Sequence, residues 1–547
     1  MIFFQILLFF ISIVFVSLSM SGYGSLINLK IKNNFFLDIF IGLIIVSFLI
    51  TIFHFFFKID FKISLLIFTL GLFIFIQNKK FKPLDYFKKK NCHYLILISL
   101  FVPMYLSQKY HEDFGYYHLP YALAFLEEKI IFGFANINSA YVYNSIWLNL
   151  NSIFLLYDKN FNFLNLPSYL LFLSFVIFSL QNILNSKNIK VSDYYLVISL
   201  FYFILKFTRI SEYGVDFPTA IFSVLGIFYF IKFCEVDFDE EKKDYFYLNL
   251  IFCVFALLVK LSVLPLILLP LFIYIKNFKI FKFYIFHTKF LFIYFFALLF
   301  FVQQFIYTGC FIFPTDLSCF NVSWFNNDYL NLSKQLELTN KSFSSAKNIY
   351  TPNEYLSNYT WFPFWLKRNY AEILEHLGTI LLPILLFALF LKKKDTNVEI
   401  FKENKLIYLF LFLSIIFWLN FSPVYRFGIH IFITLVYLLS INILISKEFS
   451  KKIFAIFIII FIFFNFSKNI QRLIKADEIF IGIQRIDNLY IKKETYSNEY
   501  ANVFHPYAEK NVKKNGWQGI LCWDIPFICS WEDFNINKKN TYLFLVK

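Results

Sequence analysis

The stretch "FFLDIFIGLIIVSFLITIFHFFF" at residues 35–57 is long enough and apolar enough to cross a lipid bilayer as one helix. A helix needs about 20 mostly apolar residues to span the hydrocarbon core. Comparable runs recur along the whole 547-residue chain, of which 59% is hydrophobic and only 16% is charged. The sequence therefore predicts an all-α integral membrane protein with many spans.

The hydrophobic runs predict 13 to 14 transmembrane helices, several of them short. The candidate spans are 2–19, 35–57, 63–77, 93–107, 166–184, 193–208, 217–233, 246–261, 263–276, 289–305, 376–391, 405–420, 428–446 and 452–466. Lysine runs separate some of these spans, at 79–90, 276–289, 392–405 and 447–452. Lysine-rich loops tend to stay in the cytoplasm. Both termini and the long loops 107–165 and 306–375 are therefore expected on the extracytoplasmic side.

The sequence also limits the class of protein. The formal net charge of +15 does not indicate a nucleic-acid partner, because the lysines lie in loops between spans. No phosphate loop and no G-x-G-x-x-G turn occurs, which disfavours ATP-driven pumping and Rossmann redox chemistry. The 82 phenylalanines, with abundant Ile, Lys, Asn and Tyr, fit AT-rich codons. We therefore expect a multi-pass protein of a bacterial inner membrane.

Four of the seven cysteines fall in pairs on the predicted extracytoplasmic side. Cys310 and Cys319 share the loop 306–375, and Cys522 and Cys529 share the C-terminal tail. Two local disulfides would suit an oxidising compartment, and four unpaired thiols are the alternative. Zinc binding is less favoured, because neither spacing matches the C-x₂₋₄-C pattern.

Ionisable residues gather at the predicted extracytoplasmic ends of the spans. They are His111, Glu112, Asp113 and His118 in "HEDFGYYHLP", Arg209, Glu212 and Asp216 in "RISEYGVDFP", and the single cations Lys260 and Arg426. Any one of them alone could be a snorkelling anchor at a span end. Together they suit a site in which a carboxylate takes a proton from an incoming hydroxyl and cations neutralise a phosphate leaving group.

Several motifs of the sequence resemble those of a protein family. They are "HEDFGYYHLP", "GFANINSAYVYNSIW", "RISEYGVDFP", "VKLSVLP", "GCFIFP", "SPVYRFG" and "LCWDIPFIC", from about residue 100 to the end. The set resembles an uncharacterised family of bacterial polytopic membrane proteins that is similar to the GT-C superfamily of glycosyltransferases. The resemblance implies a GT-C-like fold and transfer of a sugar from a polyprenyl-phosphate donor to an extracytoplasmic glycan, lipid or protein acceptor.

The resemblance assigns the role of general base to Asp113, with Glu112 as its neighbour and candidate partner for a divalent cation such as Mg or Mn. GT-C members often show an acidic–x–acidic pattern, whereas Glu112 and Asp113 are adjacent. Adjacent side chains diverge in extended backbone, so the metal stays open beside a carboxylate-only mechanism. His118 is expected to orient Asp113 or to hold substrate, with His111 in support.

The remaining site residues divide between the donor phosphate and the sugar. Arg209, Lys260 and Arg426 are the candidate phosphate ligands, and a structural pair of Arg426 with Glu212 or Asp216 is the alternative. Asn136 and Asn144 would suit sugar hydroxyls, because an amide both donates and accepts hydrogen bonds.

The sequence also predicts how the chain divides into domains, and it leaves several alternative functions open. Residues 1–466 are predicted to form the membrane domain, with interfacial helices within 121–157. Residues 467–547 are predicted to form a small extracytoplasmic domain. An oligosaccharide polymerase or ligase of cell-surface polysaccharide synthesis, a lipid-sugar transporter or flippase, and a non-catalytic scaffold remain alternatives.

Overall fold

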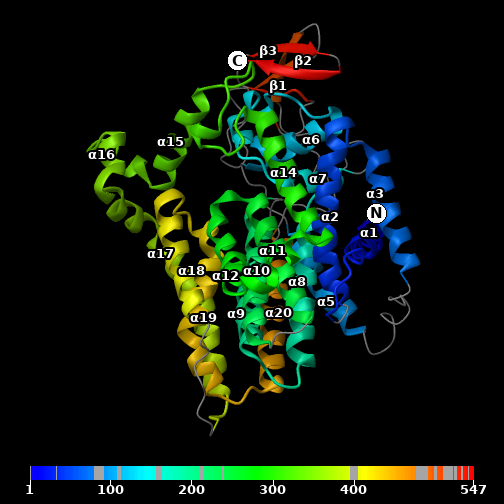
Figure 1. Cartoon of the computed structure of the whole chain (residues 1–547), viewed down its shortest axis with the longest axis vertical. Coiled ribbons are helices and arrows are strands. Elements are labelled where there is room, and N and C mark those ends of the chain that lie inside the picture. The colour runs from blue at the N-terminus through cyan, green and yellow to red at the C-terminus, as the bar shows by residue number, and fades with distance from the viewer. Residues whose placement is uncertain are drawn as a thin grey trace.

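The protein is a bundle of long helices with smaller elements covering one end (Figure 1). The computed structural model describes residues 2–31, 34–78, 92–107, 113–155, 163–207, 214–236, 240–394, 404–475, 491–497, 502–508, 522, 527–530, 534–539 and 541–546. We call the end that carries α6, α7, α15 and the strands the cap end. The opposite end, at which α8 and α17 finish and α9 and α20 begin, is called the lysine end.

The main helices of the bundle are α1 (Ile2–Gly24), α2 (Phe35–Phe56), α3 (Phe61–Gln77), α5 (Cys92–Leu106), α8 (Leu166–Asn185), α9 (Val191–Lys206), α10 (Asp216–Glu235), α11 (Glu240–Val259), α12 (Leu268–Lys276), α14 (Thr288–Thr308), α17 (Trp361–Phe390), α18 (Asn404–Phe421), α19 (Ile429–Ile445) and α20 (Lys451–Ile474). The 3-10 helix η6 (Leu261–Ile267) leads directly into α12, and α13 (Phe278–Phe281) and η7 (Tyr284–Phe286) follow it.

The smaller elements of the cap end come from four parts of the chain. They are η2 (Phe114–His118), α6 (Leu119–Glu127), η3 (Phe134–Asn136), η4 (Ser139–Val142), α7 (Ile146–Ser152), η8 (Asp316–Ser318), α15 (Asp328–Asn340), η9 (Phe343–Ser345), α16 (Pro352–Leu356), η10 (Ser357–Tyr359), η11 (Tyr425–Gly428) and the strands β1 (Ile491–Ser497), β2 (Asn502–Ala508), β3 (Asn535–Lys539) and β4 (Tyr542–Val546). The strands form two antiparallel pairs, β1 with β2 and β3 with β4.

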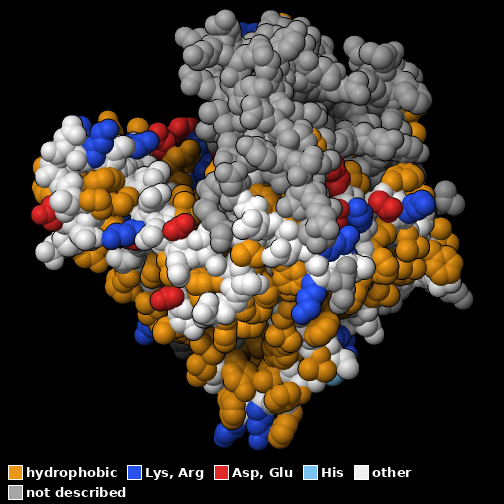
Figure 2. Space-filling model, turned by 90° about the horizontal axis from the view of Figure 1, so that it is seen from above, with side chains coloured by type: hydrophobic (Ala, Val, Ile, Leu, Met, Phe, Trp, Pro, Cys, Tyr) orange, Lys and Arg blue, Asp and Glu red, His pale blue; other side chains and the backbone are white. Residues whose placement is uncertain are grey.

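The described residues include seven helices that are long and apolar enough to cross a membrane, namely α2, α8, α10, α14, α17, α20 and the segment Tyr425–Ile445. Leu261–Lys276 and Phe278–Phe286 make an eighth candidate that is bent by 92°. Each of the predicted spans coincides with a helix, and several are shorter apolar helices. The chain is thus a multi-pass, mainly helical membrane protein, whereas the number of 13 to 14 crossings stays a prediction. Seen from the cap end, large areas of the visible surface are hydrophobic (Figure 2).

Close backbone contact fixes the first helices of the bundle. A Cβ atom added to Gly42 of α2 would lie 1.8 Å from the carbonyl oxygen of Met20 in α1. A Cβ added to Gly22 would lie 2.0 Å from the carbonyl oxygen of Gly71 in α3. Small residues let helices approach closely in a membrane, where association depends on packing more than on the hydrophobic effect. Glycines 22, 42 and 71 therefore determine how α1, α2 and α3 fit together.

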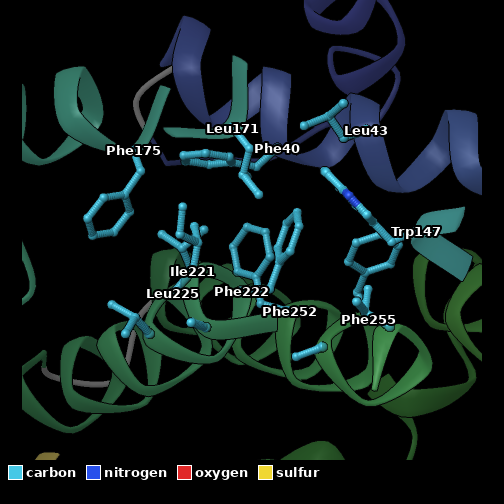
Figure 3. Packing of buried hydrophobic residues seen from close by; sticks show 14 of the residues in the cluster. Phe40, Leu43, Trp147, Leu171, Phe175, Ile221, Phe222, Leu225, Phe252 and Phe255 are labelled. Atoms are coloured by element: carbon cyan, nitrogen blue, oxygen red, sulfur yellow. The ribbon is translucent and has the colours of Figure 1, made fainter. Parts of the chain in front are cut away.

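Aromatic side chains fill the middle of the bundle. Figure 3 shows Phe40 of α2, Phe222 of α10 and Phe252 of α11 meeting in one cluster, with Trp147 of α7 beside Phe255. Trp147 is fully buried, and its ring centroid lies 6.2 Å from that of Phe222. A cap-end element therefore reaches down into the core of the helical bundle.

The first long loop is packed more deeply than the sequence predicted. Every residue of α7 and the first seven residues of α6 are buried. The hydroxyl of Ser145 donates a hydrogen bond to the carbonyl of Val259 at 2.8 Å, which ties the start of α7 to the end of α11. The expectation of helices lying along a membrane surface is therefore revised, because both faces of α6 and α7 are covered by protein. At seven residues, α7 is also far too short to cross a bilayer.

The C-terminal segment is attached to the first long loop. The amide of Phe132 donates to the carbonyl of Leu543 at 3.0 Å, and the amide of Leu545 donates back to the carbonyl of Phe132 at 2.9 Å. The rings of Phe132 and Phe544 stack with centroids 4.4 Å apart. Helix α20 continues to Ile474, past the predicted boundary at 466. Strand β4 is thus integrated into the cap end, and the predicted separate domain at 467–547 stays untested.

Candidate functional site

Three segments that are far apart in the sequence bring one carboxylate and two cations together at the cap end. Asp216 is the first residue of α10, Lys260 follows the last residue of α11, and Arg426 lies in η11 between α18 and α19. Each lies where a helix begins or ends, because an ionised side chain there can reach polar surroundings that the middle of a span lacks. At the N-terminus of α10, the helix dipole also favours the negative charge of Asp216.

The carboxylate of Asp216 bridges the two cations. Lys260 Nζ donates a hydrogen bond to Asp216 Oδ1, and Arg426 Nε lies 3.1 Å from Asp216 Oδ2. The side chain of Lys260 is 19% exposed and that of Arg426 is 40% exposed. Phe427 lies close to both cations, with its ring centroid 3.1 Å from Lys260 Nζ and 5.6 Å from Arg426 Cζ. The carboxylate and the aromatic ring together offset part of the cost of holding two like charges side by side.

Asp113 belongs to the same electrostatic neighbourhood. It is half-buried and immediately precedes η2, and its charge acts on both Asp216 and Lys260. Asp216, Lys260 and Arg426 were each singled out from the sequence, and the structure brings these three into contact. The alternative in which Arg426 pairs with Asp216 is also borne out.

A narrow pocket opens on this cluster. It has a volume of about 10 Å³ and is lined by Asp216, Thr219, Ala220, Lys260, Ser262, Arg426, Phe427, Ile429 and His430. Pockets for whole organic ligands usually measure about 300–1,000 Å³, whereas this one has room for about one water molecule. Sequence reasoning missed Ser262 and His430. The signal for His430 was available, because an ionisable residue inside an apolar span is often functional.

A second polar group adjoins the cluster through Tyr425. The hydroxyl of Tyr202 in α9 lies 2.6 Å from Nδ1 of His376 in α17, and the His376 ring centroid lies 4.9 Å from that of Tyr425. Lys206 and Glu375 form an ion pair beside them. Sequence reasoning passed over His376 because the predicted span 376–391 began there, whereas α17 begins at Trp361. Glu375 and His376 therefore lie within a long apolar helix.

Four predicted site residues cannot be placed in this way. His111, Glu112, Arg209 and Glu212 lie outside the described residues. His118 is described, is 2% exposed, and lies in η2 with its ring centroid 4.1 Å from that of Tyr117. Its role in orienting Asp113 stays a prediction.

The two predicted sugar-binding asparagines instead hold the cap end together. The side-chain amide of Asn136 donates to the carbonyls of Trp324 at 3.1 Å and Leu545 at 2.9 Å, and its oxygen accepts from the hydroxyl of Tyr329. It therefore joins the first long loop to the second and to β4. Asn136 is 4% exposed and has a structural role, and its predicted contact with a sugar stays a prediction.

Asn144 is part of a buried polar network. Its oxygen accepts from the Tyr121 hydroxyl at 3.0 Å, and its nitrogen donates to Gln303 Oε1 at 3.0 Å. Asn149 bonds to the same two residues: its oxygen accepts from the Tyr121 hydroxyl at 2.7 Å, and its nitrogen donates to Gln303 Oε1 at 2.9 Å. Burial raises the pKa of Tyr121, so its hydroxyl stays protonated and can donate. Buried polar groups need such partners, so Asn144 has a structural role, and its predicted sugar contact stays a prediction.

Both predicted disulfides are present at the cap end. Cys310 pairs with Cys319 just after α14, and Cys522 pairs with Cys529. Among the described residues, no three His, Cys, Asp or Glu side chains gather in a way that could hold a metal ion. Glu112, the predicted metal partner of Asp113, lies outside that part of the chain.

Comparisons with known proteins place the site within a family. No curated protein and no solved structure matches the chain significantly. The family model described as a domain of unknown function, DUF8201, matches residues 1–433. This range contains Asp113, Asp216, Lys260 and Arg426, and it ends before the C-terminal strands. Because the match covers well over half of its length, the chain belongs to the DUF8201 family.

Proposed function

We propose that the protein is a membrane glycosyltransferase that moves a sugar from a polyprenyl-phosphate donor to an acceptor hydroxyl at the cap end. The observation that carries the proposal is that Lys260 and Arg426 share the carboxylate of Asp216, with Asp113 near enough for its charge to act on Lys260. Transfer from a lipid phosphate needs a base for the acceptor and positive charge for the leaving phosphate. The four residues supply both.

In the proposed reaction, the carboxylate of Asp113 takes the proton of the acceptor hydroxyl. The acceptor oxygen forms a bond to the anomeric carbon of the sugar, and the bond between that carbon and the phosphate oxygen breaks. The electron pair of the broken bond stays on the polyprenyl phosphate, which gains one negative charge as Asp113 loses one. The total charge is therefore conserved.

Charge complementarity favours this sequence of events. With Asp113 ionised, two carboxylates balance Lys260 and Arg426. When Asp113 takes the proton, the same four groups carry a net positive charge, just as the leaving phosphate becomes more negative. An arginine can contact Asp216 through Nε and still direct other N–H groups toward a phosphate. The narrow pocket has room for only about one water molecule, so the phosphate, the sugar and the acceptor would all lie outside it.

Two features support an extracytoplasmic position for the proposed site. Both disulfides lie at the cap end, as is typical of an oxidising compartment. The lysine-rich connections lie at the other end, as is typical of cytoplasmic loops. We therefore place the proposed reaction on the outer face of a bacterial plasma membrane.

The decisive experiment is a transfer assay with purified full-length protein. A panel of polyprenyl-phosphate sugars is incubated with membrane extract, and released polyprenyl phosphate and glycosylated product are measured. Asp113→Asn should lower the rate at least about 100-fold, the typical contribution of a general base. Asp316→Asn is the matched control, because Asp316 is an exposed carboxylate elsewhere at the cap end, and it should leave the rate unchanged.

The thermal unfolding of Asp113→Asn is measured in parallel, so that a lost fold is not mistaken for lost chemistry. Undiminished transfer by a folded Asp113→Asn variant would remove Asp113 from the mechanism. A native protein that uses none of the donors, while its fold is intact, would count against the proposed activity as a whole.

A further inference from the structure

At the lysine end, the connections between helices enclose a second pocket that lies far from the candidate site. It has a volume of about 630 Å³ and is formed by the α8–α9 connection, the end of α10, the segment after α17, and the α19–α20 connection. Lysines 187, 190, 394, 447 and 451 line it, against two carboxylates, Glu235 and Glu448. The positive-inside rule explains why lysines occur in such loops. It does not require them to converge on one cavity.

The walls of this lysine pocket are held by specific contacts. The amide of Lys394 donates to the carbonyl of Ser446 at 2.9 Å, and the amide of Glu448 donates to the carbonyl of Lys392 at 2.8 Å. This pairing fixes the segment after α17 against the α19–α20 connection. Lys451 Nζ donates to the carbonyls of Leu184 and Ser186, at 2.7 Å and 2.6 Å, and so joins α20 to the end of α8. The pocket is therefore preformed.

The carboxylates do not neutralise the lysines. Glu235 accepts hydrogen bonds from the amide and the hydroxyl of Ser192, at 2.6 Å and 2.5 Å, so it caps α9. Glu448 is exposed. Within the described part of the chain, the side chains of Lys187, Lys190, Lys394 and Lys447 make no ion pair or hydrogen bond. Four like charges around one cavity repel one another, and an anion would relieve that repulsion.

The surroundings favour a ligand that comes from the membrane. The floor contains Tyr194 and Phe449, whose ring centroids lie 5.8 Å apart. The helix ends that lead into the pocket expose large apolar side chains, including Leu184 at 40%, Ile443 at 43% and Phe390 at 65%. A lipid could place its headgroup among the lysines and its acyl chains along these residues. Basic pockets between membrane helices are typical sites for phosphate-rich lipid headgroups.

We propose that the lysine pocket binds the headgroup of an anionic phospholipid that carries more than one phosphate. Lysines from three separate connections would each contact a phosphate oxygen, and the lipid would link the ends of α8, α17 and α19. This site is separate from the proposed transfer reaction. It can therefore be tested, and can fail, without reference to that activity.

The test measures binding of fluorescent diphosphatidylglycerol to full-length protein in a neutral detergent. The variant Lys187→Gln/Lys394→Gln/Lys447→Gln removes one charge from each of the three connections. The control Lys279→Gln/Lys282→Gln/Lys405→Gln removes three exposed lysines of the same end that do not line the pocket. We expect the pocket variant to bind at least about tenfold more weakly than the native protein, and the control to bind within about twofold of it.

Two further arms identify the ligand. Phosphatidylcholine, which has no net charge, should not compete, and neither should inorganic pyrophosphate at concentrations similar to those of the lipid. If pyrophosphate competed as effectively as the unlabelled lipid, the ligand would be a soluble polyphosphate, and the proposal of a lipid site would be overturned. Equal binding by the pocket and control variants would overturn it as well. Thermal unfolding of both variants without lipid checks that a loss of binding is not a loss of fold.

Discussion

Arg426 Nε lies 3.1 Å from Asp216 Oδ2, although Asp216 lies in the middle of the family-matched sequence and Arg426 near its end. Lys260 contacts the other oxygen of the same carboxylate. One acid thus holds two cations at the cap end. If the acid is removed, two positive charges remain with no carboxylate between them, whereas removal of either cation leaves one neutral pair.

This asymmetry predicts an order of stability among variants. Asp216→Asn should lower the free energy of unfolding by about 2 kcal/mol, because it leaves both cations uncompensated. Lys260→Met and Arg426→Met should each cost less, about 1 kcal/mol for the more exposed arginine. The double variant Asp216→Asn/Lys260→Met should recover part of the loss. Thermal unfolding in detergent measures all four, and a milder effect for Asp216→Asn than for both single cation variants would contradict the bridging role.

Enzyme kinetics can separate the proposed transferase from a polymerase or ligase. For the transferase, Asp113→Asn and Arg426→Ala should both lower the rate strongly, because base and phosphate stabilisation act in one transition state. For the alternative, Arg426→Ala should be severe and Asp113→Asn mild. Arg426→Lys keeps the charge but loses the planar fork, so it should fall between native and Arg426→Ala. The comparison of the rate constants, with Asp316→Asn as control, decides between the two.

Much of the helical framework could be predicted from the sequence, because apolar length is a local property. Each predicted span coincides with a helix, and both cysteine pairs form disulfides. The contacts that the sequence does not reveal are those of polar residues whose partners are distant. No residue near Asn136 in the sequence indicates that its amide donates hydrogen bonds to Trp324 and Leu545, so the amide was interpreted as available for a ligand.

Part of the candidate site could also be predicted from a local property of the sequence, the presence of charged residues in apolar surroundings. Asp113, Asp216, Lys260 and Arg426 stand out because charge is rare in an apolar chain, and the last three of them are in contact. Ser262 was missed because a hydroxyl in an apolar run gives a weak signal, and His430 was missed although an ionisable residue in an apolar span is a usable signal. The bridging of two cations by Asp216, and the burial of α6 and α7, depend on tertiary packing that no local pattern specifies.

Helix packing gives a prediction with an internal control. Gly42→Ala should destabilise the protein by about 1–3 kcal/mol, because its Cβ would collide with the backbone of Met20 and α1 would have to shift. Gly378→Ala in α17 adds the same methyl group where no atom lies within 4 Å. It should be neutral or stabilise by about 0.5–1 kcal/mol, because alanine favours the helix. Equal thermal unfolding of the two variants would contradict the close contact.

The sidedness of the cap end can be measured independently of any activity. Gln335 in α15 and Lys282 after α13 are exposed at opposite ends of the bundle. If the lysine end is cytoplasmic, a membrane-impermeant maleimide added to intact cells should label Gln335→Cys and leave Lys282→Cys unlabelled. Permeabilised cells should show labelling of both, which controls for accessibility, and the parent protein gives the background from the cysteines outside the two disulfides. The reverse pattern would place Asp113 and its two cations on the cytoplasmic side, where an extracytoplasmic acceptor could not reach them.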